Sequence, residues 1–553
     1  MTNMPNVITI FSGLDRMTPQ ITNKARILLS DFRTCRLSDL NPTFARNMTI
    51  KKVRVRFAPS PTGGLHLGGV RTVLFNYLFA KKNGGDFVLR IEDTDQNRYV
   101  EGAEEYILDC LKWCGLLPDE SPAVGGPFAP YRQSERKSIY REYAEKLVRQ
   151  GHAYYAFDTP EELEQNRREI PNFQYGHVYR GGLRNSLSLT EHEVDELLNA
   201  QTPHVIRIKV PVDQRVVFHD MIRGQVAFDT NQVDDKVLLK ADGMPTYHLA
   251  VVVDDYLMKI THAFRGEEWL PSAPVHLLLW EYLGWKADMP QWAHLPLILK
   301  PDGHGKLSKR DGARLGFPVY AMNWFDAKTG ELTPGFRELG FLPEAFLNLL
   351  ATLGWNEGTG QELFSLEELI EKFTMDRISK AGAKFDFDKA KWFNAEWIKQ
   401  SEAESLKAGV RNILEDKGVS VTNDGYLLKV IDKVKDRCVL MPDFYQQCAY
   451  FFEQPKEYDL PSVKSKWTDA KTAFFNDLVS LFKNVTPWEE VELETAFKSL
   501  AEEKAIKPGE LLLPFRVMLV GGKFGPHVFD IAALLGKEET ISRIENAVAV
   551  FAR

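Results

Sequence analysis

The stretch Arg54–Gly69, RVRFAPSPTGGLHLGG, constrains the fold more than any other part of the chain. Its first residues alternate as in a β-strand, Pro59 and Pro61 end that strand, and the apolar spacing after Leu65 predicts a helix. A strand, a glycine-rich turn and a helix N-terminus favour a bound anion, because free backbone N–H groups and the helix dipole both attract negative charge. The sequence therefore predicts a phosphate site here.

A second stretch complements the first. His66 lies at the predicted helix start, and Gly68 and Gly69 lack the side chains that would keep a nucleotide away. Much later, KLSKR at Lys306–Arg310 places basic residues around Ser308 in a mobile cationic loop suited to a polyphosphate. Alone, a glycine-rich turn is usually only a turn and loop lysines are usually solvated. Together, in this order, the two stretches indicate a nucleotide site.

These motifs give the chain a resemblance to the glutamyl-tRNA synthetases of the bacterial type, running from about Val53 to the C-terminus. Between the two stretches lie further segments similar to that family: RIEDTD (Arg90–Asp95), FAPYRQSER (Phe128–Arg136), DGMPTYHLAVVVDD (Asp242–Asp255) and RGEEWLPSAPVH (Arg265–His276). The region similar to the family's HIGH motif comprises Pro59, Ser60, Pro61, Thr62, Gly63, Gly64, Leu65, His66, Leu67, Gly68 and Gly69. The region similar to its KMSKS loop comprises Lys306, Leu307, Ser308, Lys309 and Arg310. Gly69 stands where the family often has a second histidine, which puts a role for that position in doubt but not the function.

Hydrophobic periodicity predicts an α/β fold followed by helices. Strands over 53–58 and 86–91 alternate with helices over 67–82 and 101–114, which is typical of a doubly wound parallel sheet. Further elements expected along the chain are a helix over 134–150 that ends at Gly151, a helix near 190–199, and strands over 204–210 and 225–230. Beyond Phe341 the pattern is almost wholly helical.

The resemblance implies a class I Rossmann-type catalytic domain with an inserted acceptor-binding domain, followed by an all-helical anticodon-binding region. The expected boundaries are a leader over 1–48, the first catalytic half over 49–131, the insertion over 132–246, the second catalytic half over 247–305, the KMSKS loop and stem-contact domain over 306–400, and the anticodon-binding domain over 401–553.

Composition fits a soluble protein of several domains. The 553 residues are 44% hydrophobic and 26% charged, and no apolar run reaches the roughly 18–20 residues that span a bilayer, so no membrane is expected. A net charge of −7 argues against indiscriminate nucleic-acid binding, although a local basic surface is enough for a polyanion.

The cysteines indicate a reducing compartment. The five of them, Cys35, Cys110, Cys114, Cys438 and Cys448, are odd in number and scattered. Cys110 and Cys114 lie one helical turn apart, but no second pair with zinc spacing follows, so we expect core packing. Some relatives carry zinc in the acceptor-binding insertion; here that region reads HAYYAFDTPEELE without cysteine, so we expect no zinc.

The first 48 residues fall outside the resemblance. They are poor in acids and contain arginine, as in an organelle transit peptide, which would place the protein in the mitochondrial matrix. Alternatively, translation starts at Met48 and the preceding segment is an artefact or a disordered tail. We favour the second interpretation and a cytoplasmic protein.

Glutamate carries two carboxylates and one ammonium, so a selective pocket needs two fixed cations and one fixed anion. The resemblance implies Arg56 and Arg265 as the cations, because an arginine fork suits a carboxylate. It places Arg56 where members of the family hold the side-chain (γ) carboxylate. It implies Glu92 for the ammonium, with Ser60 adding a hydroxyl and Tyr247 closing the pocket. RIEDTD alone would be a solvated turn, but its place after a predicted strand favours a site.

Activation joins the α-carboxylate to the α-phosphate of ATP and releases pyrophosphate, without a protein nucleophile. Positioning and electrostatic stabilisation are therefore sufficient. We expect His66 and Lys309 to stabilise the phosphates, Lys306 to assist, and Mg²⁺ to screen the charge. The predicted ATP ligands are His66, Gly68, Glu268 and Lys309. The terminal ribose hydroxyl of tRNA then attacks the glutamyl-adenylate.

The resemblance also implies tRNA(Glu) as partner, bound by a monomer. The insertion would hold the acceptor end, and Arg437 and Arg516 would face the anticodon, although both could be ordinary surface arginines. A glutaminyl-tRNA synthetase usually shows PPEPNG where this chain has APSPTG. A shorter paralogue that glutamylates a tRNA base lacks the helical region. A non-catalytic RNA-binding derivative would not need His66 or Lys309.

Overall fold

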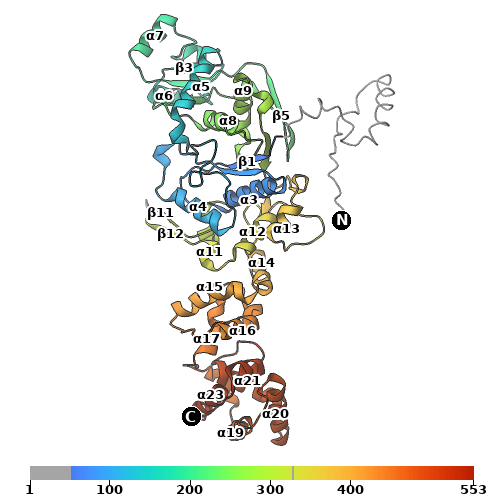
Figure 1. Cartoon of the computed structure of the whole chain (residues 1–553). Coiled ribbons are helices and arrows are strands. Elements are labelled where there is room, and N and C mark those ends of the chain that lie inside the picture. Colours follow the sequence, from blue (N-terminus) through green and yellow to red (C-terminus); the bar gives the residue numbers. More distant parts are fainter. Residues whose placement is uncertain (1–50, 327–328, 553) are drawn as a thin grey trace, which may run out of the picture. The chain divides into compact units, whose positions relative to one another are not determined.

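The computed structural model describes residues 51–326 and 329–552, apart from the side chains of Lys309, Arg310 and Ala313 (Figure 1). Residues Val53–Arg553 form one compact unit. The predictions made for the leader over 1–48, and for Cys35 within it, lie outside the described residues. No helix of the described chain is long and apolar enough to cross a membrane.

A six-stranded sheet forms the centre of the catalytic region. Its strand order is β2-β1-β8-β9-β5-β6, with bounds β1 (Arg54–Phe57), β2 (Asp86–Leu89), β8 (His262–Gly266), β9 (Gln291–Leu295), β5 (Arg215–Asp220) and β6 (Gly224–Asp229). The strands β2, β1, β8, β9 and β5 run parallel, and β6 pairs antiparallel with β5. This arrangement confirms the predicted doubly wound parallel sheet.

The principal helices of this region are α3 (Leu67–Lys82), α4 (Ala103–Trp113), α5 (Lys137–Arg149), α8 (Tyr247–Leu257) and α9 (Ala273–Tyr282). The helix α3 packs on β1, β2 and β8, and α9 contacts β5. The helices α3, α4 and α5 lie in the segments predicted to be helical. The bounds of α3 are those predicted. The strand predicted over 86–91 is shorter in the structure, where β2 ends at Leu89 and its partner β1 ends at Phe57. The helix predicted over 134–150 begins with a 3₁₀ turn at Gln133–Arg136.

A smaller three-stranded sheet lies within the segment predicted as the insertion. It consists of β3 (Ala153–Ala156), β4 (Val205–Ile208) and β7 (Val237–Leu239), accompanied by α6 (Pro160–Glu169) and α7 (Glu191–Asn199). The strand predicted over 225–230 is present as β6, but it belongs to the central sheet. The hairpin β5–β6 is joined to that sheet by the pairing of Asp220 with Trp292, a long-range contact that local pattern does not reveal.

Short strands and helices connect the central sheet to the helical half. They are β10 (Ile298–Leu299), α10 (Lys309–Leu315), β11 (Trp324–Asp326), β12 (Glu331–Thr333), α11 (Phe336–Leu339), α12 (Pro343–Thr352), α13 (Leu366–Lys372), β13 (Ala383–Lys384) and α14 (Phe387–Gln400). The strand β10 pairs in parallel with β13, and β11 pairs antiparallel with β12. The sequence pattern did not indicate these four short strands.

The C-terminal part is helical, as predicted, and follows α14 in the orange-to-red portion of Figure 1. Its helices are α15 (Ala403–Asp416), α16 (Asp424–Val434), α17 (Asp443–Phe452), α18 (Leu460–Val463), α19 (Asp469–Phe482), α20 (Glu490–Glu503), α21 (Pro508–Val520), α22 (Val528–Leu535) and α23 (Lys537–Phe551). Cys438 and Cys448 pack in the core of this region, and Cys110 and Cys114 pack in the catalytic core, so the core-packing prediction is confirmed.

Candidate active site

One cleft of about 1090 Å³ brings together residues that are far apart in the sequence. The glycine-rich turn lines one part of it, and the segments after β2 and β8, the start of α8 and the KLSKR loop line the rest. The predicted site residues that line it are Arg56, Pro59, Ser60, Pro61, Thr62, Leu65, His66, Gly68, Gly69, Glu92, Tyr247, Arg265, Glu268, Lys306, Leu307 and Ser308. Gly63, Gly64 and Leu67 of the predicted HIGH-like region do not line it. Their proximity agrees with a single site, while their individual roles remain predictions.

His66 is fixed at the N-terminus of α3. Its backbone is extended, and its Nδ1 accepts a hydrogen bond from the Gly68 N–H at 3.1 Å. An accepting Nδ1 carries no proton, so the neutral imidazole bears its proton on Nε2. His66 therefore caps the helix with one nitrogen and keeps the other as a donor.

The glycine-rich turn is packed closely against the segment that follows α10. A Cβ at Gly64 would lie 2.7 Å from Tyr320 Cε1 and 2.8 Å from Trp324 Cγ, so a side chain does not fit there. At Gly68 a Cβ would meet only His66 Nδ1, at 3.6 Å. Gly64 thus serves packing, whereas Gly68 leaves space beside the helix N-terminus.

The KLSKR segment is anchored more firmly than a free loop. Leu307 is buried and its N–H donates to the Ile298 carbonyl at 2.8 Å. Ser308 caps α10, with its N–H and Oγ both donating to the Asp311 carboxylate. Lys306 Nζ lies 2.5 Å from Glu268 Oε1 at the edge of the cleft. The side chains of Lys309 and Arg310 lie outside the described part, so their predicted roles stay predictions.

Two guanidiniums and two carboxylates form a buried network beneath the turn. Arg56 donates through Nε to Asp255 Oδ1 at 3.1 Å and through Nη1 to the Phe264 carbonyl. Arg90 donates to the same Asp255 oxygen at 2.8 Å and to Glu92 Oε1 at 3.1 Å. Burial opposes ionisation of Asp255, but Arg56 and Arg90 outweigh it and lower its pKa. Burial raises the pKa of Glu92, with the two arginines offsetting part of that effect.

The backbone sets Glu92 beside the turn. The Arg90 N–H donates to the Phe57 carbonyl at 3.0 Å, and the Glu92 N–H donates to the Pro59 carbonyl at 2.9 Å. The β1–β2 ladder therefore continues past the end of both strands into the predicted site. This continuation places the Glu92 backbone beside Pro59, and both residues line the cleft.

Arg265, on β8, is surrounded by polar rings. Its Nη1 donates to Tyr247 Oη at 3.0 Å and lies 3.1 Å from His276 Nδ1, while its Nε donates to His294 Nε2 at 2.8 Å. Its Nη2 is buried and has no hydrogen-bond partner among the described residues. A buried donor without a partner is costly, so Nη2 is suited to a ligand oxygen.

Sequence reasoning missed several residues of this site. Asp255 and Arg90 fall inside segments quoted for the resemblance, but their pairing with Arg56 depends on tertiary contacts. Arg71, on α3, lines the cleft and donates to the Leu353 and Pro296 carbonyls. Burial lowers the pKa of Arg71 to about 10, against the opposing charges of Glu268 and Glu267. The signal available in the sequence was the position of this arginine, which interrupts the apolar residues of the predicted helix.

The two predicted anticodon residues lie near each other in the helical region. Arg437 is exposed in the 3₁₀ turn after α16, and among the described residues no carboxylate pairs with it; Asp432 pairs instead with Lys435. Arg516 donates through Nη1 to the carbonyls of residues 524–526. Burial lowers the pKa of Arg516, and the charge of Arg437 lowers it further. Arg516 therefore stabilises the segment 524–526, a role that the prediction did not include.

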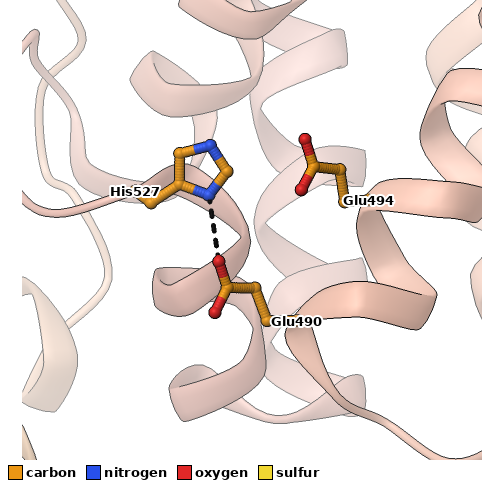
Figure 2. Close-up of side chains that lie close together, drawn as sticks. All are labelled: Glu490, Glu494 and His527. Atoms are coloured by element: carbon orange, nitrogen blue, oxygen red, sulfur yellow. Dashed lines mark ion pairs between the residues drawn. The ribbon is translucent and has the colours of Figure 1, made fainter.

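A histidine–carboxylate cluster lies away from the cleft, between α20 and α22 (Figure 2). His527 Nδ1 is 3.3 Å from Glu490 Oε1, and the possible ligand atoms of Glu490, Glu494 and His527 lie within 4.8 Å of one another. Glu494 pairs with Lys498 at 2.7 Å, and a hydrogen bond with Asp530 raises the pKa of Glu490. Lys498 pairs with Glu494, and Lys433 pairs with Asp530, the neighbour of Glu490. Lysines of the chain therefore already pair with these carboxylates, and we assign no metal to the cluster.

Comparison with known proteins places this architecture in a family. Residues 52–392 match the family described as tRNA synthetases class I (E and Q), catalytic domain, and residues 403–548 match the anticodon binding domain. The glutamate–tRNA ligase of Phocaeicola vulgatus is 50% identical over 504 residues, which cover 91% of this chain and 100% of that protein. The glutamate–tRNA ligase of Christiangramia forsetii is 50% identical over 501 residues, covering 90% of this chain and 99% of that protein.

A solved structure agrees with these relatives. The crystal structure of a glutamate tRNA ligase from Elizabethkingia meningosepticum, in complex with its amino acid, matches with a TM-score of 0.86 and 48% identity, and covers 91% of this chain and 100% of that one. The catalytic and anticodon-binding regions are those of a class I aminoacyl-tRNA synthetase. Within that class, the chain belongs to the glutamate–tRNA ligase family.

Proposed function

We propose that the cleft binds L-glutamate and ATP, forms glutamyl-adenylate, and transfers the glutamyl group to the 3′ end of tRNA(Glu). The observation that best supports this proposal is the pattern of charged side chains around a single cleft. Arg265 and Arg56 supply two cations, and Glu92 supplies one anion. Glutamate offers the complementary set of two carboxylates and one ammonium.

The two arginines differ in how much charge they offer a ligand. Arg56 contacts the Asp255 carboxylate at 3.1 Å, so its charge is partly balanced before a substrate binds. Arg265 contacts neutral rings and a phenol, and its Nη2 has no partner among the described residues. We therefore assign Arg265 as the stronger carboxylate anchor, with Arg56 keeping the γ-carboxylate role expected from the sequence.

The nucleotide would lie between the N-terminus of α3 and the KLSKR loop. His66 keeps an Nε2 donor there, and the α3 N-terminus adds positive partial charge. Lys306 extends from the other side, held by Glu268. Class I synthetases use ATP. Such groups stabilise negative charge that develops on the phosphates, without a covalent intermediate on the protein.

Mg²⁺ fits this site as an ATP-bound ion. It is usually held by one or two carboxylates together with substrate phosphates. Glu268 is a cleft carboxylate beside the KLSKR loop and is the residue of this chain that would hold it. When bound, Mg²⁺ screens the phosphate charges.

The partners and location follow from the family. The anticodon binding domain supports tRNA(Glu) as the nucleic-acid partner, and the ligand-bound relative supports glutamate. Bacterial relatives support a cytoplasmic enzyme. We propose a monomer.

The test is ATP–pyrophosphate exchange with L-glutamate in the presence of purified tRNA(Glu), followed by aminoacylation of the same tRNA. The wild-type chain should do both, and glutamine should replace glutamate poorly. Glu92→Gln removes the proposed anion without changing side-chain size, and it should raise the KM for glutamate. Binding of tRNA without any exchange would overturn the proposal and favour an RNA-binding derivative.

A further inference from the structure

Behind the cleft, a chain of hydrogen bonds leads from Arg265 to a buried aspartate. Arg265 and His294 are directly opposite partners on the parallel strands β8 and β9. His294 Nδ1 lies 2.6 Å from Asp220 Oδ2, at the end of β5. Asp220 and His294 are fully buried and do not line the cleft. Neither residue is placed to touch a substrate.

The hydrogen bonds determine the tautomer of His294. A guanidinium only donates, so the bond from Arg265 Nε requires an accepting Nε2 on His294. The ring proton must then reside on Nδ1, where the Asp220 carboxylate accepts it. Burial lowers the pKa of His294, with Asp220 opposing that effect. His294 is therefore a neutral acceptor toward Arg265.

The same logic applies on the other side of Arg265. His276 Nδ1 must accept from Arg265 Nη1, so its Nε2 carries the proton and donates to His248 Nδ1 at 3.2 Å. Burial lowers the pKa of His276 well below its ordinary value and that of His248 to about 4. Both rings are neutral near pH 7.

This surrounding leaves Arg265 its charge. Nε and both hydrogens of Nη1 are engaged by neutral acceptors: His294, His276 and the Tyr247 hydroxyl. Among the described residues no carboxylate forms an ion pair with Arg265; Asp220 is separated from it by the His294 ring. Nη2 retains two donors without a described partner. The guanidinium is held on three sides and free on the fourth.

We propose that Asp220 and His294 are positioning residues for glutamate binding: they fix the rotation of Arg265 so that Nη2 faces a substrate carboxylate. Direct pairing with a carboxylate would also hold Arg265, but it would compete with the substrate for its charge. A neutral ring, with its tautomer set by a distant aspartate, orients the cation without neutralising it. This inference rests on the proposed function, in which Arg265 is a glutamate ligand.

Asp220→Asn provides the first test, because it should reverse the tautomer. Asp220 Oδ1 accepts the N–H groups of Ile222 at 2.9 Å and Arg223 at 2.8 Å, so these N–H groups should retain the asparagine oxygen. The new NH₂ group then takes the place of Oδ2, donates to His294 Nδ1 and moves the ring proton to Nε2. It also loses the hydrogen bond that Oδ2 accepts from the His294 backbone N–H at 3.1 Å. The His294 Nε2–H and the Arg265 Nε–H are then two donors that face each other, so their hydrogen bond is lost and Arg265 must shift.

The expected result is a split between substrates in the exchange assay. The KM for glutamate should rise on the order of 10- to 100-fold, the range expected for a misaligned hydrogen bond to a charged group. The KM for ATP should stay within about two-fold, since ATP is not proposed to contact Arg265. A purely structural role for Asp220 would impair both substrates together.

A second pair of substitutions separates the role of the acceptor from folding. His294→Gln offers Arg265 an amide oxygen while its NH₂ can donate to the Asp220 carboxylate, so it should restore most of the glutamate KM that His294→Leu loses. His294→Leu, which removes the acceptor and leaves Asp220 intact, should raise that KM as Asp220→Asn does. If Asp220→Asn does not fold, the comparison of His294→Gln with His294→Leu decides.

His262→Gln is the matched control. His262 lies on the same strand as Arg265, contacts Thr261 Oγ1 at 2.9 Å, and has no described contact with Arg265, so its substitution should leave both KM values unchanged. An unchanged glutamate KM in Asp220→Asn and in His294→Leu, or failure of His294→Gln to restore it, would overturn this inference alone. Absence of glutamate-dependent exchange in the wild type would instead overturn the proposed function.

Discussion

At the residue scale, two arginines of the same cleft differ in their surroundings. Arg56 shares Asp255 with Arg90, whereas Arg265 is held by neutral groups. Residue type predicted two cations for two carboxylates, and that much was available from the sequence. The neighbours that decide the balance of charge come from α8, β8 and β9, and their approach depends on the tertiary fold.

Arg56→Ala should remove the preference for glutamate over glutamine. Without the guanidinium the γ-carboxylate loses its proposed partner, and Asp255 remains in the network with Arg90 alone. We expect the ratio of kcat/KM for glutamate to that for glutamine to fall toward one, measured by tRNA-dependent exchange with each amino acid. If discrimination persists unchanged, another residue recognises the side chain.

Lys309→Ala should slow activation by on the order of 100–1,000-fold, as removal of other electrostatic donors does. The proposed role of Lys309 is greatest in the transition state, so the KM for glutamate should change little. Single-turnover adenylate formation measures the effect. Lys306→Ala, whose ammonium is already paired with Glu268, serves as the comparison and should lose less. Near-normal turnover in Lys309→Ala would disprove the assignment.

At the element scale, local periodicity predicted the principal helices well, because their buried faces repeat within one segment. The helix α3 matches its predicted bounds, and α7 lies at the predicted 190–199. Two-residue strands such as β10 and β13 could not be predicted, because each exists only through its partner far along the chain. The same dependence on long-range contacts applies to the cleft. The motif residues could be identified from the sequence, but the hydrogen-bond network behind Arg265 could not.

Asn394, on α14, joins elements of the two halves. It is fully buried, accepts from the Leu342 N–H at 2.8 Å and donates to the Val439 carbonyl at 2.6 Å. Asn394→Ala would remove both hydrogen bonds from these partly buried backbone groups, so we expect a loss of about 1–3 kcal/mol in the free energy of unfolding.

Chemical denaturation followed by tryptophan fluorescence measures that loss. Asn484→Ala is the control, because Asn484 is exposed and, among the described residues, its side chain bonds only to the Ser480 carbonyl one turn earlier. Equal stabilities for the two variants would show that the Asn394 hydrogen bonds do not contribute to the junction.

At the scale of the whole molecule, buried histidines make stability depend on pH. Burial lowers the pKa values of His248 and His262 to about 4 and also lowers those of His276 and His294. Below an unfolded value of about 6.5, the unfolded chain binds protons that the folded chain does not, so stability falls as pH falls. Three carboxyl groups with raised pKa values, Glu92, Asp235 and Glu490, oppose this trend.

We therefore expect the melting temperature of the catalytic region to fall by several degrees between pH 7 and pH 5. Differential scanning calorimetry at a series of pH values measures it. His262→Gln removes one of the four histidines and should make the dependence less steep. A melting temperature that rises between pH 7 and pH 5 would contradict the predicted direction of the pH dependence.

The choice of tRNA belongs to the same scale, since the predicted contact is remote from the cleft. Arg437 is exposed and has no described ion pair, which weakens the alternative that it offsets Asp432 or Asp436. Glutamate and glutamine anticodons differ in their third base, cytosine against guanine. A guanidinium placed against cytosine would crowd the larger purine.

Arg437→Gln should increase charging of tRNA(Gln) relative to tRNA(Glu) by about 10-fold, the effect of one lost base contact, while adenylate formation is unchanged. Steady-state aminoacylation of both purified tRNAs measures the ratio. Lys429→Gln, a substitution on the preceding helix α16, is the control. An unaltered ratio would remove Arg437 from the recognition set.

The two-residue ladder between β10 and β13 joins the KLSKR segment to the helical half. Leu307 and Lys306 bond back to β10, β10 pairs with β13, and β13 directly precedes α14. A displacement of α14 would therefore shift the KLSKR segment, which is proposed to bind the nucleotide. Thermodynamic reciprocity then applies: whatever factor tRNA binding contributes to ATP affinity through this ladder, ATP contributes to tRNA affinity.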